Sequence, residues 1–338
     1  MELKKTINDS LKIGLSLLLG GLILYWMYRD FDFNHLRRVL THDMNWTWML
    51  LSFPFGILAQ MFRGWRWHLT LEPVGEHPRT LTSINSIFLS YAVSLVVPRI
   101  GEFARCGVLR RYDGVSFPKA LGTVVMERAI DSMLVMMIAL LTFLLQFRIF
   151  NTFFNRTGTN IESIMTSFSS AGYAVTAVCG IAVCILLWYI MRRFAIYNKV
   201  KSMVRGIWQG VMSIRSVKSP ALFVTLTLAI WASYFLHYYL TFFCFEATSQ
   251  LGMACAIVTF IVGSIAVIVP TPNGAGPWHF AVKTMLILYG VSDTDALNFV
   301  LIVHSIQTLL VVALGVWAWG TLSMTKVRKA TAVEGKQD

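Results

Sequence analysis

Six apolar stretches, each close to the roughly 20 residues that a helix needs to cross a bilayer, constrain what this chain can fold into. They lie near residues 11–28, 46–62, 120–147, 171–191, 221–245 and 296–319. Only 14% of the 338 residues are charged, whereas soluble domains carry about 25%. The deficit extends along the whole chain, so we predict an all-α, polytopic helical bundle in a membrane.

Other apolar stretches are shorter or interrupted. Residues 251–270 and 275–290 flank a run of prolines and glycines, and we expect both to cross the membrane. Residues 81–97 are rich in Ser and Asn and end at Pro98, so we expect this segment to be re-entrant or short. The sequence therefore predicts about eight spans, some of them broken.

Basic residues predict the orientation of these spans. The net charge is +12, and most of the 29 lysines and arginines fall in segments that eight spans would place on one side. Membrane proteins concentrate Lys and Arg in their cytoplasmic loops. We therefore expect both termini in the cytoplasm, and the positive charge requires no nucleic-acid partner.

The predicted spans leave no segment long enough for a separate catalytic domain. We predict one transmembrane domain over residues 1–320 and a polar, disordered cytoplasmic tail over 321–338. The longest loop, 192–220, is basic and interleaved with apolar residues. It is either an amphipathic helix on the inner leaflet or an ordinary cytoplasmic loop.

Two breaks in the apolar pattern resemble each other. The stretches "SLVVPRIGE" (94–102) and "AVIVPTPNG" (266–274) both pass from β-branched apolar residues into proline and glycine. On the predicted topology they enter the membrane from opposite sides. This arrangement is typical of transporters built from inverted repeats whose broken helices meet at mid-membrane. The alternative is a chance likeness of two apolar segment ends.

The stretch "MERAID" places three charges inside an apolar run. Glu127, Arg128 and Asp131 share one face of a helix. A charge at the centre of a spanning helix costs about 2.5–3.5 kcal/mol, so all three need partners or water. We expect Arg128 to pair with Asp131 and Glu127 to find a cation elsewhere. The group is an ion-pair clamp between helices, a polar lining of a substrate path, or both.

The stretch "VPRIGEFARCGVLRR" (97–111) supplies candidate partners. Pro98 ends one helix and Gly101 permits a turn. The charged residues that then recur at helical spacing are Arg99, Glu102 and Arg105. Either arginine can pair with the "MERAID" carboxylates or grip a phosphate through its planar fork. The alternative is a set of arginines that snorkel to the cytoplasmic edge.

The stretch "VIVPTPNGAGPWHF" (267–280) breaks a segment that is otherwise apolar enough to be helical. Pro277 suits the first position of a helix. The two glycines before it would leave backbone N–H groups open to an anion at that helix start. The alternative is a kink that lets helices pack closely. The candidate site residues here are Pro272, Gly274, Gly276, His279 and Lys283.

Several shorter sequence features indicate structural roles. The stretch "RGWRWHL" (63–69) is typical of an aromatic and basic belt at the membrane interface. Three polar residues inside spans are each expected to make an interhelical hydrogen bond; they are His237, His304 and Gln307. No Cys/His cluster has metal-ligand spacing, so we expect neither a metal nor a cofactor.

These motifs together resemble the lysylphosphatidylglycerol synthase transmembrane (flippase-like) family, over roughly residues 10–320. The residues that carry the resemblance most specifically are Pro98, Gly101, Glu102, Arg105, Glu127, Arg128 and Asp131. The late motif of the family is Pro-Gly-Gly-x-Gly followed by a glutamate. This chain matches it at Pro272, Gly274 and Gly276, but Asn273 replaces one glycine and His279 stands where the acid is expected.

The resemblance implies a protein of the bacterial inner (plasma) membrane that moves, or helps to move, a lipid between leaflets. We expect a transporter whose partner is an anionic or phosphate-bearing lipid, and no lysylphosphatidylglycerol synthesis. Arg99, Arg105 and Arg128 would attract the phosphate. Glu102, Glu127 and Asp131 would balance these arginines or relay protons.

Two other functions remain open on the sequence. One is a membrane-embedded enzyme that modifies lipid headgroups, with acid–base candidates Glu127, Asp131, His279 and His304. The other is a non-catalytic membrane assembly factor, in which the buried charges matter only for folding. The sequence leaves the oligomeric state open.

Overall fold

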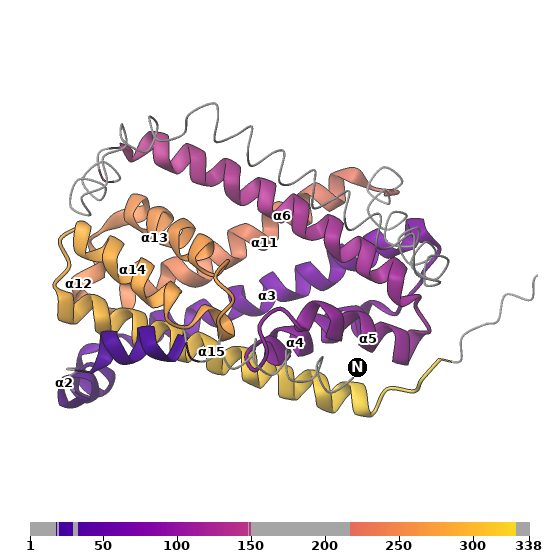
Figure 1. The fold of residues 1–338 in the computed structure, drawn as a ribbon, viewed down its shortest axis with the longest axis horizontal. Helices are drawn as coiled ribbons and strands as arrows, with labels where there is room; N and C mark the ends of the chain where they lie inside the picture. Colours follow the sequence, from indigo (N-terminus) through magenta and orange to yellow (C-terminus); the bar gives the residue numbers. More distant parts are fainter. Residues whose placement is uncertain (1–17, 19, 30–32, 148, 150–216, 329–338) are drawn as a thin grey trace, which may run out of the picture.

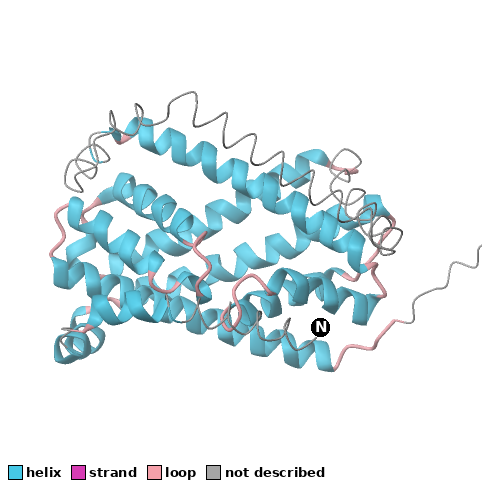
Figure 2. Cartoon of the chain, in the orientation of Figure 1, coloured by secondary structure: helices cyan, strands magenta, loops and turns pink. Residues whose placement is uncertain are grey.

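The computed structural model describes residues 18, 20–29, 33–147, 149 and 217–328. Within these residues every regular element is a helix, and no strand occurs (Figure 2). The predicted all-α membrane bundle is therefore confirmed. The predicted span 171–191, most of the loop 192–220 and the last ten residues lie outside the described residues.

Four long helices run along the length of the bundle (Figure 1): α3 (Trp46–Leu71), α6 (Phe117–Leu145), α11 (Pro220–Tyr239) and α15 (Asp293–Ser323). A 3₁₀ segment, η4 (Leu240–Cys244), extends α11. In the part of the chain that the structure describes, α6, α11 with η4, and α15 are long and apolar enough to cross a membrane. The predicted span 46–62 forms the first part of α3, which continues to Leu71 and is not among these three.

Two pairs of shorter helices fold back as hairpins. The first pairs α4 (Thr80–Ser94) with α5 (Gly101–Asp113), and the second pairs α13 (Gly252–Ala266) with α14 (Pro277–Leu288). At 1.5 Å per residue, α13 and α14 are only about 22 and 18 Å long, less than the roughly 30 Å of a hydrocarbon core. The expectation that 251–270 and 275–290 each cross fully is therefore wrong. The short 81–97 segment is confirmed as α4.

The tips of the two hairpins touch near the middle of the bundle (Figure 1). The Arg99 guanidinium donates from Nη2 to the carbonyl oxygen of Ile268, at 2.6 Å. Arg99 (φ 63°) and Asn273 (φ 52°), one in each tip, are the described non-glycine residues with positive φ, a conformation that is uncommon outside glycine. The two broken segments therefore meet in the structure, through this contact between their tips.

Gly101 serves a different purpose from the one predicted. The turn is made at Arg99, whereas Gly101 is the first residue of α5 and is buried. A Cβ atom there would overlap the carbonyl oxygen of Ser90 and the hydroxyl of Ser94 in α4. Gly101 therefore lets the two helices of the hairpin approach closely, as small residues do between membrane helices.

The two ends of the bundle carry different segments. One end holds α2 (Phe33–Arg38), a π-helical turn η1 (Val39–Asp43), α12 (Glu246–Ser249) and the start of α15 (Figure 1). The other end holds the end of α3, the short η2 (Glu72–Val74), the end of α5 and the start of α6. The second end is the one that the sequence places in the cytoplasm.

We expect Gly315→Val to destabilise the bundle by about 1–3 kcal/mol, the usual cost of overpacking. A Cβ atom on Gly315 of α15 would overlap the Cβ atom of Ala92 in α4. Gly320, on the same helix, has no atom within 4 Å of such a Cβ, so Gly320→Val controls for helix propensity. Thermal unfolding in detergent measures both variants; equal melting temperatures would contradict the close packing.

Candidate functional site

A cluster of buried charges joins α3, α5 and α6. Arg66 donates from Nη1 to Oδ1 of Asp131 at 2.8 Å, and its Nε lies 3.5 Å from Oε1 of Glu127. Arg63 reaches Oδ2 of Asp131 at 3.1 Å. Arg105 reaches Oε2 of Glu127 at 3.0 Å. All five side chains are buried. Each charge has therefore lost its contact with water, and the ion pairs compensate for the cost of that loss.

This cluster confirms the pairings that the sequence predicted. Arg128 Nη2 lies 2.9 Å from Oδ2 of Asp131, three residues on. Glu127 finds its cation in Arg105, which also lies 2.7 Å from Glu102. The interpretation as an ion-pair clamp between helices is confirmed, although it leaves the substrate-path interpretation open.

The interpretation of "RGWRWHL" as an interfacial belt is wrong. Trp65 is 46% exposed, but Arg63, Arg66 and Trp67 are buried. The Trp67 indole donates to Oγ1 of Thr123 at 2.9 Å, and the Arg105 guanidinium lies over its ring at 4.5 Å. The signal that identifies this face is the i, i+3, i+4 spacing, which puts the three buried residues on one side of α3.

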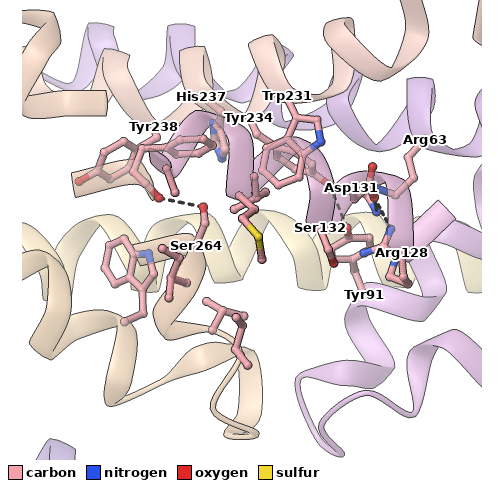
Figure 3. A pocket seen from close by; sticks show the side chains of 18 of the residues that line it. Arg63, Tyr91, Arg128, Asp131, Ser132, Trp231, Tyr234, His237, Tyr238 and Ser264 are labelled. Carbon is pink, nitrogen blue, oxygen red and sulfur yellow. Dashed lines mark hydrogen bonds and ion pairs between the residues drawn. The ribbon is translucent and has the colours of Figure 1, made fainter. Parts of the chain in front are cut away.

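A cavity of about 600 Å³ lies beside the charge cluster, between α3, α6, α11 and the second hairpin (Figure 3). One end is polar and is lined by Arg63, Tyr91, Arg128, Asp131, Ser132 and Tyr234. The rest is mainly apolar and aromatic, and its lining includes Val135, Met136, Ala139, Trp231, Phe260, Ile265, Val267, Ile268 and Trp278. The cavity is therefore amphipathic, with its charge confined to one end.

The polar end presents one accessible cation. The Arg63 side chain is 3% exposed, whereas that of Arg128 is 38% exposed. The described ion pairs of Arg128 use Nε and Nη2, which leaves the Nη1 donors for a ligand. Two tyrosine rings flank Arg63: the centroids of Tyr91 and Tyr234 lie 6.0 and 5.6 Å from its guanidinium carbon, and the Tyr234 hydroxyl donates to that of Tyr91 at 3.0 Å.

The predicted site residues do not all reach this cavity. Arg128 and Asp131 line it, together with Val267 and Ile268 from the tip of the second hairpin. Arg105, Glu127 and Glu102 stand behind it in the ion-pair network, and Arg99 holds the hairpin tips together. The residues of the second break that lie outside its lining are Pro272, Gly274, Gly276, His279 and Lys283.

The expected open backbone donors at 274–276 are absent from the structure. The N–H of Gly274 donates to the Thr271 carbonyl at 3.1 Å, and the N–H of Ala275 donates to the Pro272 carbonyl at 2.9 Å. The N–H of Gly276 points to Nδ1 of His279 at 3.4 Å. The break satisfies these donors internally, which corrects the prediction that they are available to an anion. Pro277 does begin α14, as predicted.

His279 lines a second cavity, of about 520 Å³, between residues 24–29, α14 and α15. Its ring centroid lies 4.4 Å from that of His304, whose Nε2 lies 3.1 Å from the Asn273 carbonyl oxygen. Lys283 does not join this pair, because its Nζ lies 2.9 Å from Asp293 at the start of α15. The four acid–base candidates are therefore not gathered in one cavity. Asp131 lines the 600 Å³ cavity, His279 and His304 line the 520 Å³ cavity, and Glu127 is fully buried and lines neither.

The remaining polar predictions hold. His237 Nδ1 lies 2.9 Å from the Ser52 carbonyl oxygen, and Gln307 donates to the His237 carbonyl at 3.4 Å. Each contact links two helices, as expected. Within the described ranges, no group of three or more His, Cys, Asp or Glu residues is placed to hold a metal ion.

Comparisons with known proteins bear on this arrangement. No curated protein and no solved structure matches the chain. The family described as "Lysylphosphatidylglycerol synthase TM region" matches residues 13–315. This range contains the whole charge cluster, both hairpins and the lining of the cavity beside them. The chain belongs to the lysylphosphatidylglycerol synthase TM region family.

Proposed function

We propose that this protein is a transporter that moves a phosphate-bearing lipid between the two leaflets of the membrane. The observation that carries this proposal is the amphipathic cavity of about 600 Å³, with a reachable arginine at one end. The family supports a role connected with membrane lipids. The movement of lipid, and the kind of lipid, are our inference from the cavity.

The polar end suits a phosphate headgroup. The guanidinium of Arg128 offers its Nη1 donors to a phosphate oxygen, in a charge-assisted hydrogen bond. Asp131 and Glu102 hold this guanidinium from the opposite side, at 2.9 and 3.5 Å. The two carboxylates fix the orientation of the arginine, so that less side-chain freedom is lost when a ligand binds.

The apolar part of the cavity suits the chains of a lipid. Val135, Met136 and Ala139 form one wall along α6, and Val267 and Ile268 form part of another at the hairpin tip. Lipid chains in such a groove remove apolar surface from water at roughly 25 cal/mol per Å². A lipid with its headgroup at Arg128 and its chains along these walls would make polar contacts at one end of the cavity and apolar contacts in the rest of it.

The paired hairpins give the cavity a wall that can rearrange. Broken backbone at membrane depth is tolerated where it is buried in protein or lines a cavity. Here the break places Val267 and Ile268 in the cavity wall, while the Arg99 contact to Ile268 joins this wall to the first hairpin. Movement of one hairpin against the other would therefore change the wall of the cavity directly.

The test is transbilayer movement of lipid in liposomes that contain the purified protein. Fluorescent phosphatidylglycerol in the inner leaflet should become accessible to a membrane-impermeant quencher faster than in protein-free liposomes. Arg128→Gln should slow this movement by about tenfold, in line with the loss of one charge-assisted contact. Arg110→Gln, at an exposed position near the end of α5, is the matched control and should leave the rate unchanged.

Movement equal to that in protein-free liposomes, for phosphatidylglycerol and for a panel of other phospholipids and polyprenyl phosphates, would refute the proposal. Equal rates for Arg128→Gln and Arg110→Gln would refute the role of Arg128. Lipid analysis of cells that lack the protein separates the enzyme alternative, because an enzyme leaves a product missing, whereas a transporter leaves the lipid set intact and changes its distribution.

A further inference from the structure

A third cavity, of about 430 Å³, lies at the end of the bundle opposite the predicted cytoplasmic end. It is lined by α2, η1, α12 and the first turns of α15, which come from three distant parts of the sequence, and it is open to solvent on one side. Its lining consists of His35, Val39, Asp43, Phe245, Glu246, Ala247, Thr248, Asp295 and Asn298. None of these residues belongs to the charge cluster or to the cavity that we propose for lipid.

The charged side chains of this cavity are acidic, apart from His35, a base that carries charge only when it is protonated. Asp43 comes from η1, Glu246 from α12 and Asp295 from the first turn of α15, and the lining includes no lysine or arginine. Among the described residues, none of these three carboxylates has a basic group within ion-pairing distance. Asp295 accepts one hydrogen bond, from the Ser292 hydroxyl at 2.7 Å. The carboxylates therefore keep most of their acceptor capacity for a cation.

Asn298 provides an independent indication of a ligand. It lies one turn after Asp295 on α15, lines the same cavity and is only 2% exposed. Neither its Oδ1 nor its Nδ2 makes a hydrogen bond with any residue that the structure describes. A buried amide without partners costs about 1–3 kcal/mol, and such groups are rare in folded proteins. An amide in this position is suited to a ligand that both donates and accepts.

We propose that this cavity binds a small organic ammonium ion that carries a neighbouring oxygen, that is, an amino alcohol, either free or as the headgroup of a lipid. The ammonium would donate to one carboxylate and to Oδ1 of Asn298, the other carboxylates would attract its charge at longer range, and the oxygen would accept from Nδ2. A bare metal ion fits less well, because these side chains are not gathered into a metal-ligand set. The volume lies within the range of small-molecule sites.

This site does not depend on the proposed lipid transport. It shares no lining residue with the cavity at Arg128, and a ligand there makes no use of the lipid cavity. Its test is accordingly a binding measurement that does not require transport activity.

The experiment titrates the purified full-length protein, in nanodiscs of phosphatidylglycerol alone, with ethanolamine by isothermal calorimetry. Saturable binding that weakens with salt is expected, with no binding of the neutral analogue ethylene glycol. The double variant Asp43→Asn/Glu246→Gln should weaken binding about tenfold. Both side chains are exposed, so this variant should fold normally. Asp293→Asn, two residues from Asp295 but outside the cavity lining, is the matched control and should bind as the unaltered protein does.

Asn298→Leu separates a ligand contact from a structural role. It removes an unsatisfied buried amide, so it should leave the melting temperature unchanged or higher, while it weakens ethanolamine binding about tenfold. A second arm compares nanodiscs with and without phosphatidylethanolamine. Binding of free ethanolamine that this lipid leaves unaffected identifies a soluble ligand, and competition by the lipid identifies a headgroup.

Three results would overturn the proposal. The first is the absence of saturable ethanolamine binding in nanodiscs of phosphatidylglycerol alone. The second is equal weakening by Asp293→Asn and by the double variant, which would show unspecific attraction. The third is a lower melting temperature for Asn298→Leu with unchanged binding, which would give Asn298 a purely structural role.

Discussion

Arg105→Met is expected to lower the free energy of unfolding by about 3–5 kcal/mol, because removal of one partner from a buried ion pair leaves the other charge uncompensated. Arg105 is 1% exposed, pairs with Glu127 at 3.0 Å and covers the ring of Trp67. Arg111→Met, at an exposed position on the same helix, should change stability by less than about 0.5 kcal/mol. Chemical unfolding in mixed micelles measures both variants.

The double variant Arg105→Met/Glu127→Gln sharpens this prediction. Arg66 would keep Asp131 at 2.8 Å, so loss of both partners should cost much less than the sum of the two single substitutions. Additive costs would show that the two residues do not act as a pair. A neutral Arg105→Met would show that the cluster contributes little to the fold.

Ala139→Trp is expected to reduce lipid movement to the protein-free background while the protein remains folded. Ala139 is a small residue in the apolar part of the 600 Å³ cavity, and an indole there would occupy the space that we assign to lipid chains. The side chain enters an existing cavity and not a packed core, so the cost of overpacking should be small. The liposome assay measures the rate, and thermal unfolding measures stability.

Leu140→Trp is the control for this substitution. Leu140 is the next residue of α6, is 60% exposed and is outside the lining of the cavity. It should leave the rate of lipid movement unchanged. If both tryptophan variants retain full activity, the lipid does not use this cavity. If both lose activity equally, the effect comes from α6 as a whole.

The local parts of the fold were predictable from the sequence. Apolar runs identified α6, α11 and α15, and Pro277 marked the start of α14. These features follow from hydropathy and backbone chemistry, which act over a few residues. The lengths of α13 and α14 were overestimated, because the prolines and glycines between them allow a hairpin as readily as two separate spans.

The candidate site was predictable only in part. The cost of charge in a membrane required partners for Glu127 and Asp131, and this reasoning found Arg105 and the Arg128 pair. It missed Arg63 and Arg66, because they lie in an aromatic and basic stretch that is also typical of the membrane interface. Asn298 is an isolated asparagine at the start of a long apolar helix. Its sequence context did not indicate that its side-chain amide would be buried without hydrogen-bond partners.

The sequence by itself determined that the chain is a helical membrane protein, where most of its helices lie, and that its buried charges must be paired. Only the tertiary structure decided which residues meet. Arg66 and Asp131 are 65 residues apart, and Arg99 and Ile268 are 169 apart. Hydropathy fixes which segments leave water, but it does not distinguish one packed arrangement of those segments from another. That choice depends on close contacts between side chains, such as Gly101 against α4, which exist only once the bundle has formed.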